Sequence, residues 1–187
     1  PAQPLSVSTN VQLEQEDIGG MLRRYPTRLN YQPSGRIAFN LSLRHETRTG
    51  WLLYSGDQNF TRFEAETWRP NFEFSYFLSA RQQARISLQW VGIKAFEHDR
   101  FVLPGTGQSL APVQNAESDR DFTISRMSFQ ARYRWELAPL SDLFVVYTRG
   151  SNVPSNIARG FGDQFSEAWK QALVDTLVVK LRYRLGN

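Results

Sequence analysis

The stretch Arg126-Met127-Ser128-Phe129-Gln130-Ala131-Arg132-Tyr133-Arg134-Trp135-Glu136-Leu137 decides the fold class of this chain. From Met127 to Leu137 every second residue is apolar or aromatic, and the residues between them are charged or polar. Successive side chains of a β-strand point to opposite faces, so this period of two predicts a strand with one apolar and one polar face. A helix would instead need apolar residues three or four positions apart.

The same alternation recurs from one end of the chain to the other. Turn-forming residues such as Gln32-Pro33-Ser34-Gly35 and Ala138-Pro139-Leu140-Ser141 separate the alternating segments. The sequence therefore predicts an all-β, antiparallel, up-and-down sheet of about eight strands. The predicted strands span residues 5–13, 24–31, 36–46, 68–78, 84–95, 126–137, 142–149 and 177–185.

The connections differ at the two ends of these strands. Tight turns near residues 33, 80 and 139 alternate with longer loops near 19, 52, 108 and 162. Short turns on one side, long loops on the other and aromatic residues near strand ends are typical of outer-membrane β-barrels. We therefore expect a transmembrane β-barrel in the outer membrane of a Gram-negative bacterium, with outer-membrane lipid and the barrel-assembly machinery as partners.

A soluble barrel is the alternative. A lipocalin-like barrel that binds a small ligand also has eight alternating strands, with its apolar face turned inward. Its flanking helix could be Gln164–Leu173, where Phe165, Trp169 and Ala172 share one helical face. The predicted strands are longer than the usual five or six residues of globular sheets, which favours the membrane barrel. If the barrel is membrane-bound, we expect the helix to pack over or beside its outer mouth.

The composition excludes several classes of protein. The 187 residues contain no cysteine, so disulfides, thiolate metal sites and a cysteine nucleophile are absent. Aromatic residues make up 13% of the chain and its net charge is only +4, which excludes a disordered tail. No apolar run approaches the ~20 residues of a membrane helix. The isoelectric point near 9.6 does not predict nucleic-acid binding, because the basic residues alternate with apolar residues along strands.

Four segments of the chain resemble a known family. They are Gln89–Ala95, Asp121–Arg126, Arg132–Gly150 and Asp175–Tyr183, and the third segment, from Arg-Tyr-Arg-Trp to Val-Tyr-Thr-Arg-Gly, is the specific one. They resemble the C-terminal outer-membrane barrel of the domain of unknown function 5916 family. In that family an N-terminal carbohydrate-binding-like module precedes the barrel.

The resemblance implies that residues 1–187 form one β-barrel domain, the C-terminal portion of a longer protein and part of a larger barrel. The opening at Pro1 without an initiator methionine is consistent with this expectation. The resemblance further implies porin-like transport or surface binding of a carbohydrate-related ligand, reached through the missing N-terminal module. It carries over no catalytic residue and no cofactor, and we expect a protein that is not an enzyme.

The polar faces of the last strands hold the candidate site. Two of the predicted strands, 126–137 and 177–185, flank the strand 142–149, so their basic residues should form one region that lines a lumen. The candidate lumen-lining residues are Arg126, Arg132, Arg134, Lys180, Arg182 and Arg184. Such a region could prefer anions, or it could be neutralised by carboxylates such as Glu14, Glu73 and Glu136.

Catalytic and metal sites have weaker support. An integral-membrane hydrolase would need a base at the outer rim, and His45 or His98 could serve, the latter with Asp99, Asp119 or Asp121. A calcium site could use Asp57, Asn59, Asp119 and Asp121, but these residues lack a loop with defined ligand spacing. We expect neither a catalytic site nor a metal site.

Overall fold

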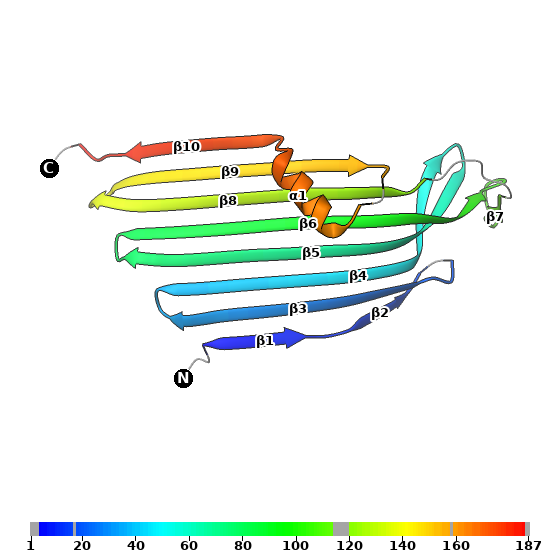
Figure 1. Cartoon of the computed structure of the whole chain (residues 1–187), viewed down its shortest axis with the longest axis horizontal. Helices are drawn as coiled ribbons and strands as arrows, with labels where there is room; N and C mark the ends of the chain where they lie inside the picture. Colours follow the sequence, from blue (N-terminus) through cyan, green and yellow to red (C-terminus); the bar gives the residue numbers. More distant parts are fainter. Residues whose placement is uncertain (1–3, 17, 114–119, 158, 186–187) are drawn as a thin grey trace.

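A computed structural model describes residues 4–16, 18–113, 120–157 and 159–185, and it is an antiparallel sheet with one helix on it (Figure 1). The prediction of an all-β, up-and-down class is confirmed. No helix in the described ranges is both long and apolar enough to cross a membrane. The strands are β1 (Leu5–Thr9), β2 (Gln12–Gln15), β3 (Met21–Ser34), β4 (Ile37–Gly56), β5 (Asn59–Ser79), β6 (Gln82–Val102), β7 (Ala111–Pro112), β8 (Phe122–Ala138), β9 (Ser141–Ser155) and β10 (Val174–Arg182).

The strands pair in the order β1-β3-β4-β5-β6-β8-β9-β10. The short β2 adds to β3 beside β1, and β7 adds to β6, so the order holds eight positions, as the alternation predicts. In the part of the chain that the structure describes, the sheet is open, with β1 and β10 as its two edges. An open edge leaves backbone donors and acceptors available to further strands.

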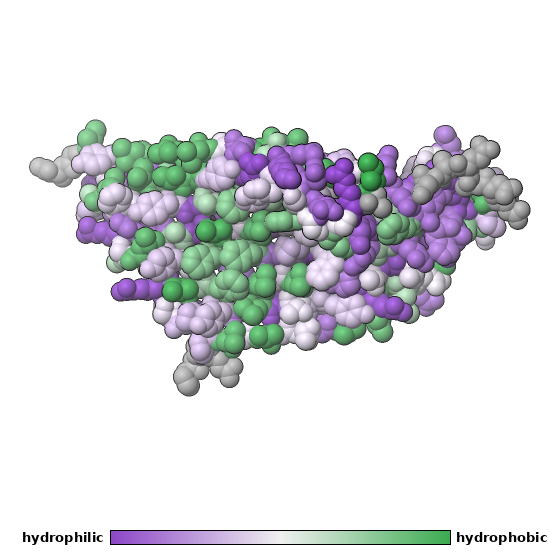
Figure 2. Space-filling view, viewed as in Figure 1, coloured by the Kyte–Doolittle hydropathy of each residue, from purple (hydrophilic) through white to green (hydrophobic). Residues whose placement is uncertain are grey.

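Strand register separates the residues of the sheet into two faces. Phe72, Leu88 and Phe129 lie in one row across β5, β6 and β8, on the face that we call the apolar face. Glu73, Ser87 and Gln130 form the next row, on the opposite, polar face. In Figure 2 the apolar face is turned toward the reader, and hydrophobic residues cover much of the left and central part.

The polarity of the two faces reverses along the strands. In β5 the apolar face carries Phe74, Phe72 and Pro70 up to Trp68, and beyond Trp68 it carries Glu66 and Glu64. The polar face changes the opposite way, from Ser75, Glu73 and Asn71 to Thr67, Ala65 and Phe63. On β9 and β10 the apolar face changes at Arg149 and Asp175, which pair with each other. Hydrophilic residues dominate the right-hand end of Figure 2, beyond this change.

A small core lies on the polar face beyond the reversal. Phe63, Ala65 and Ala95 are buried there, with Trp51, Leu53 and Phe122 packed against them. The ring centroids of Trp51 on β4 and Phe122 on β8 lie 5.9 Å apart. Two strands separate β4 from β8 in the sheet, so the distal part of the β4–β5 hairpin must bend across the ends of β6 and β8, as Figure 1 shows.

This hairpin corrects the prediction of a long loop near residue 52. Strand β4 continues to Gly56, and β5 begins at Asn59. The two residues between them, Asp57 and Gln58, have φ of 47° and 67°. Positive φ at both central positions is the geometry of a tight hairpin turn whose twist matches the flanking strands. The glycines at 50 and 56 therefore lie within a long hairpin.

The helix α1 (Phe161–Lys170) lies on the apolar face, where it contacts β6, β8 and β9 (Figure 1). A helix with Phe165 and Trp169 facing the sheet confirms part of the prediction for this loop. The helix begins and ends three residues earlier than predicted, so Ala172 lies outside it. Its packing partners are residues of the sheet: Phe161, Phe165 and Ala168 of the helix pack with Trp90 and Met127.

Candidate functional site

The basic residues predicted on strands β8 and β10 share the polar face. Arg134 lies opposite Phe144, and Phe144 lies opposite Lys180, so the three form one row across β8, β9 and β10. Arg132 lies in an adjacent row, and Arg182 faces Asp142. The structure thus brings Arg132, Arg134, Lys180 and Arg182 into one region of the face.

Arg126 and Arg184 lie apart from this region. Arg126 is six residues beyond Arg132 on β8, or about 20 Å along the strand. Its Nε donates a hydrogen bond to Asn152 Oδ1 at 2.8 Å. Arg184 follows the last residue of β10, and its backbone N donates to Ser141 Oγ at 3.0 Å. Neither residue extends the basic region.

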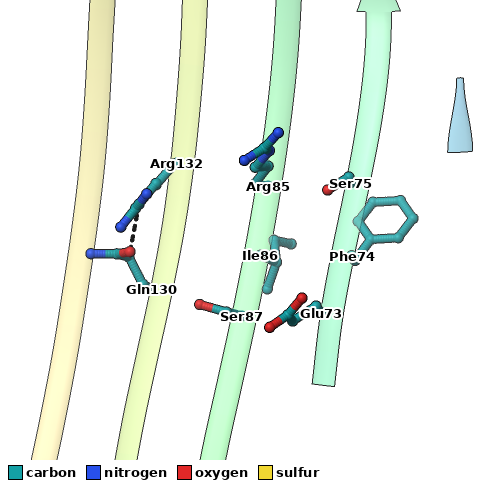
Figure 3. Close-up of a pocket in the computed structure, with 8 residues that line it drawn as sticks. All are labelled: Glu73, Phe74, Ser75, Arg85, Ile86, Ser87, Gln130 and Arg132. Atoms are coloured by element: carbon teal, nitrogen blue, oxygen red, sulfur yellow. Dashed lines mark hydrogen bonds between the residues drawn. The ribbon is translucent and has the colours of Figure 1, made fainter. Parts of the chain in front are cut away.

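Sequence reasoning missed Arg85, which completes the region. Arg85 on β6 lies directly opposite Arg132 on β8 and opposite Ser75 on β5. Arg132 Nε donates a hydrogen bond to Gln130 Oε1 (Figure 3). The carbonyl oxygen of Gln83, once its amide is oriented to satisfy its neighbours, accepts hydrogen bonds from Arg85 at 2.9 and 3.1 Å. The pairing of β6 with β8 is what brings these arginines together.

Several other arginines of this face are neutralised by buried carboxylates. Asp142, whose side chain is 6% exposed, lies 2.9 Å from Arg134 Nη2 and 3.8 Å from Arg182 Nη2. Asp142, and not the predicted Glu136, is therefore the carboxylate that pairs with Arg134 and Arg182. Glu46 is equally buried and has Arg24, Arg44 and Arg69 within 4.0 Å, and Glu14, predicted as a partner of the basic region, pairs with Arg24 instead. Buried carboxylates hold these guanidinium groups as structural partners.

Arg85 and Arg132 are different. Within the described ranges neither has a carboxylate at ion-pair distance, and Glu73, which lines the same hollow, forms no ion pair with either, so two like charges lie opposite one another. Like charges directly opposite on adjacent strands destabilise a sheet. An anion bound between them would remove this cost.

Two open hollows adjoin the arginine pair. One has a volume of about 220 Å³ and adds Glu73, Ser75 and Ser87 to Arg85 and Arg132 (Figure 3). The other has a volume of about 350 Å³ and adds Arg134, Phe144 and Val146. The hydroxyl, amide and Glu73 carboxylate groups of the first hollow and the Phe144 ring of the second suit a hydroxyl-bearing ring with a charged substituent that the two arginines bind.

The predicted catalytic residues lie in two separate places. His45 is at the polarity reversal, where its ring packs on Trp68 with centroids 4.5 Å apart and its Nε2 lies 3.1 Å from Glu66. His98 is on the outer part of β6, with its Nδ1 3.0 Å from Asp99 Oδ2 and 2.8 Å from Arg62 Nη2. The predicted His98–Asp99 contact is therefore present, while Asp119 lies outside the described residues.

Two further acidic residues at the same end of the sheet, Asp121 and Glu97, act as structural partners. Asp121 Oδ1 accepts a hydrogen bond from the backbone N of Glu97. Glu97 in turn binds Arg100 and the backbone N of Arg120. Hydrogen bonds from Arg100 lower the pKa of Glu97, and the Arg120 backbone N–H adds to this, while burial opposes it. Among the described residues no group of three or more metal-ligating side chains could hold a metal ion.

The comparisons with known proteins add one match. Residues 8–186 match a family model described as a domain of unknown function, DUF5916. Searches of curated proteins and of solved structures find no match.

Proposed function

Because this chain belongs to the DUF5916 family, we propose that it forms part of the wall of an outer-membrane β-barrel. Its apolar face contacts lipid, and its polar face lines a water-filled interior that binds and passes an anionic, carbohydrate-related ligand. The edges β1 and β10 pair with further strands that close the wall.

The polarity reversal carries this proposal. A soluble sheet buries one face against a core along its whole length, as a lipocalin-like barrel would. Here the face that is apolar between the tight turns and Trp68 becomes charged beyond Trp68. A face that meets hydrocarbon at one level and water at the next accounts for this change.

The height of the apolar belt is consistent with a bilayer. On β5 the belt runs from Ser79 to Arg69, and eleven residues at ~3.3 Å each, tilted by about 40°, span about 28 Å. The apolar band of outer-membrane barrels is about 25 Å tall. On the edge strand β10 the outward residues Leu177, Val179 and Leu181 are 64, 62 and 60% exposed, and on the inner strands Phe72, Leu88 and Phe129 are partly exposed.

The ligand class rests on two separate arguments. The unpaired guanidinium groups of Arg85 and Arg132 favour an anion. The carbohydrate component comes from the family, whose members resemble fusions of a carbohydrate-binding-like module to a barrel. A uronic acid or a sulfated sugar combines both properties.

A permeation experiment tests the proposal. The protein that contains this chain is reconstituted in liposomes, and swelling rates in glucuronate and in glucose are compared. We expect faster entry of glucuronate, and loss of this preference when Arg85 and Arg132 are both changed to Gln. Arg126→Gln serves as the matched control, because Arg126 lies on the same face but outside the basic region. Equal rates for both solutes in the unmodified protein would contradict the anion preference.

A further inference from the structure

Helix α1 lies on the same side of the sheet as the apolar belt. The sheet residues that pack with or bind the helix belong to the apolar face: Trp68, Trp90, Gly92, Ser125, Met127 and Phe129. The register excludes these residues from the face that carries Arg85 and Arg132. If the polar face lines the interior, the helix is on the outside of the wall.

Trp90, Gly92 and Ser125 of the sheet form a fitted contact surface for α1, which we call its seat. Trp90 Nε1 donates to Ser125 Oγ at 2.8 Å, and Ser125 Oγ donates to the backbone O of Gln164 at 2.8 Å. A Cβ on Gly92 would lie 2.9 Å from the Phe161 ring and 2.4 Å from the Trp90 ring, so only glycine leaves room for this packing. A defined seat of this kind fixes the helix on the wall.

Two cations contact aromatic rings of the helix where the apolar face of the sheet becomes charged. Lys94 Nζ lies 4.2 Å above the centre of the Phe161 ring. The guanidinium of Arg149 lies 5.6 Å from the centre of the Trp169 ring, and its Nη2 donates to the Trp169 backbone O at 2.6 Å. Both cations are on the apolar face where it becomes charged, so α1 lies at the level of the polarity reversal.

The helix has two sides of opposite character. Phe161, Phe165, Ala168 and Trp169 face the sheet, while Asp163, Ser166, Glu167 and Lys170 form the outer side. Hydrophilic residues cover the position of α1 in Figure 2. The helix also crosses β6, β8 and β9 instead of running along them (Figure 1), so in a membrane wall its axis would lie near the membrane plane.

We infer that α1 is an interfacial helix on the lipid side of the wall, with its outer polar side in the headgroup layer. Amphipathic helices lie in this layer with the apolar side inward and the charged side toward headgroups and water. Here the apolar side is already covered by the wall, and Trp169, packed on Phe129 at the edge of this contact, is still 39% exposed. The inference rests on the proposed membrane wall, and it places α1 away from the interior and its mouth.

Single-cysteine spin labelling tests this position, because the chain has no native cysteine. The full chain is reconstituted in vesicles of phosphatidylcholine and phosphatidylglycerol, and each label is probed with oxygen, which partitions into lipid, and with a water-soluble nickel chelate. The labelled variants are Ser166→Cys on α1, Val179→Cys in the belt and Glu64→Cys beyond the reversal. Lys170→Cys is a second position on α1 in case a label at the half-buried Ser166 disturbs packing.

We expect the ratio of oxygen to nickel collision rates at Ser166 and Lys170 to fall between the high value at Val179 and the low value at Glu64. A ratio at both α1 positions equal to that at Glu64, with Val179 still high, would overturn the interfacial position and leave the membrane wall intact. A low ratio at Val179 would overturn the membrane wall itself.

Discussion

Arg85 and Arg132 lie directly opposite each other on adjacent strands, and in the described part of the chain neither forms an ion pair with a carboxylate, although Glu73 lines the same hollow. A folded sheet tolerates this arrangement only at a cost, because both guanidinium groups repel each other on one polar face. This repulsion should lower the free energy of unfolding of the ligand-free protein, which can be measured.

Removing one charge of this pair should stabilise the protein. We expect Arg132→Gln to raise the free energy of unfolding by a few tenths to about 1 kcal/mol at low salt, and less at high salt, where charges are screened. Urea titrations in detergent at two salt concentrations measure this. Arg126→Gln, which loses a hydrogen bond to Asn152, should give no such gain. A loss of stability in Arg132→Gln would show that the pair is already neutralised.

Removing Arg134 should have the opposite effect. Arg134→Gln leaves the buried carboxylate of Asp142 with only the more distant Arg182, at 3.8 Å. We expect a loss of about 1–2 kcal/mol in the free energy of unfolding, measured by the same titrations. The double variant Arg134→Gln with Asp142→Asn should recover part of this loss. Additive effects of the two changes would argue against the ion pair.

The two faces of β10 should respond differently to charge. Val179→Arg places a cation on the apolar face within the belt, and we expect it to cost about 2–4 kcal/mol in lipid. Val178→Arg, one residue away on the polar face, should cost less than about 1 kcal/mol. Folding titrations into lipid vesicles measure both variants. Equal costs, or the reverse order, would contradict lipid contact at Val179.

The seat of α1 should depend on the absence of a side chain at residue 92. Gly92→Ala should force Phe161 outward and lower the free energy of unfolding by about 1–3 kcal/mol. Gly162→Ala is the matched control, because a Cβ there meets open space and alanine favours the helix. Protease cleavage within residues 159–171 should rise in the first variant only.

The outer end of the sheet should lose stability in acid. The pKa of Glu97 is lower in the folded chain than its ordinary value of 4.5, because Arg100 and Arg120 donate to its carboxylate. The stabilisation is therefore complete above pH 4.5 and is lost as the pH falls through the folded-state pKa. Glu97→Gln should be less stable at neutral pH and less sensitive to acid. Parallel pH curves for both proteins would contradict this role of Glu97.

Local patterns predicted the strands because alternation is a property of each strand alone. The strands of the belt, with Phe129 and Tyr133 on one face and Arg132 and Arg134 on the other, follow directly from the residue order. The pairing of Arg85 with Arg132 does not, because it depends on the register between β6 and β8. A cross-strand pair becomes visible only when the offset of the two strands is known.

One local sequence signal has two possible structural causes. The apolar residues of β6 shift to Val91, Ile93 and Ala95 near Gly92, and this shift by itself suggests a β-bulge. The register with β8 continues through Gly92 without a bulge, so that explanation is wrong. A bulge and an exchange of environments between two faces give the same sequence pattern, and only the hydrogen-bond ladder distinguishes them.

The polarity reversal also limits how such a chain can change in length during evolution. Each strand of the belt carries its own change from apolar to charged residues, at Trp68 on β5 and at Arg149 on β9. Inserting one residue between a tight turn and the reversal point of its strand would move every side chain beyond the insertion to the opposite face of the sheet. Inserting two residues would keep the faces but move the change by about 6.6 Å relative to the neighbouring strands. Insertions and deletions should therefore accumulate in the connections between strands, while the belt varies by substitution alone.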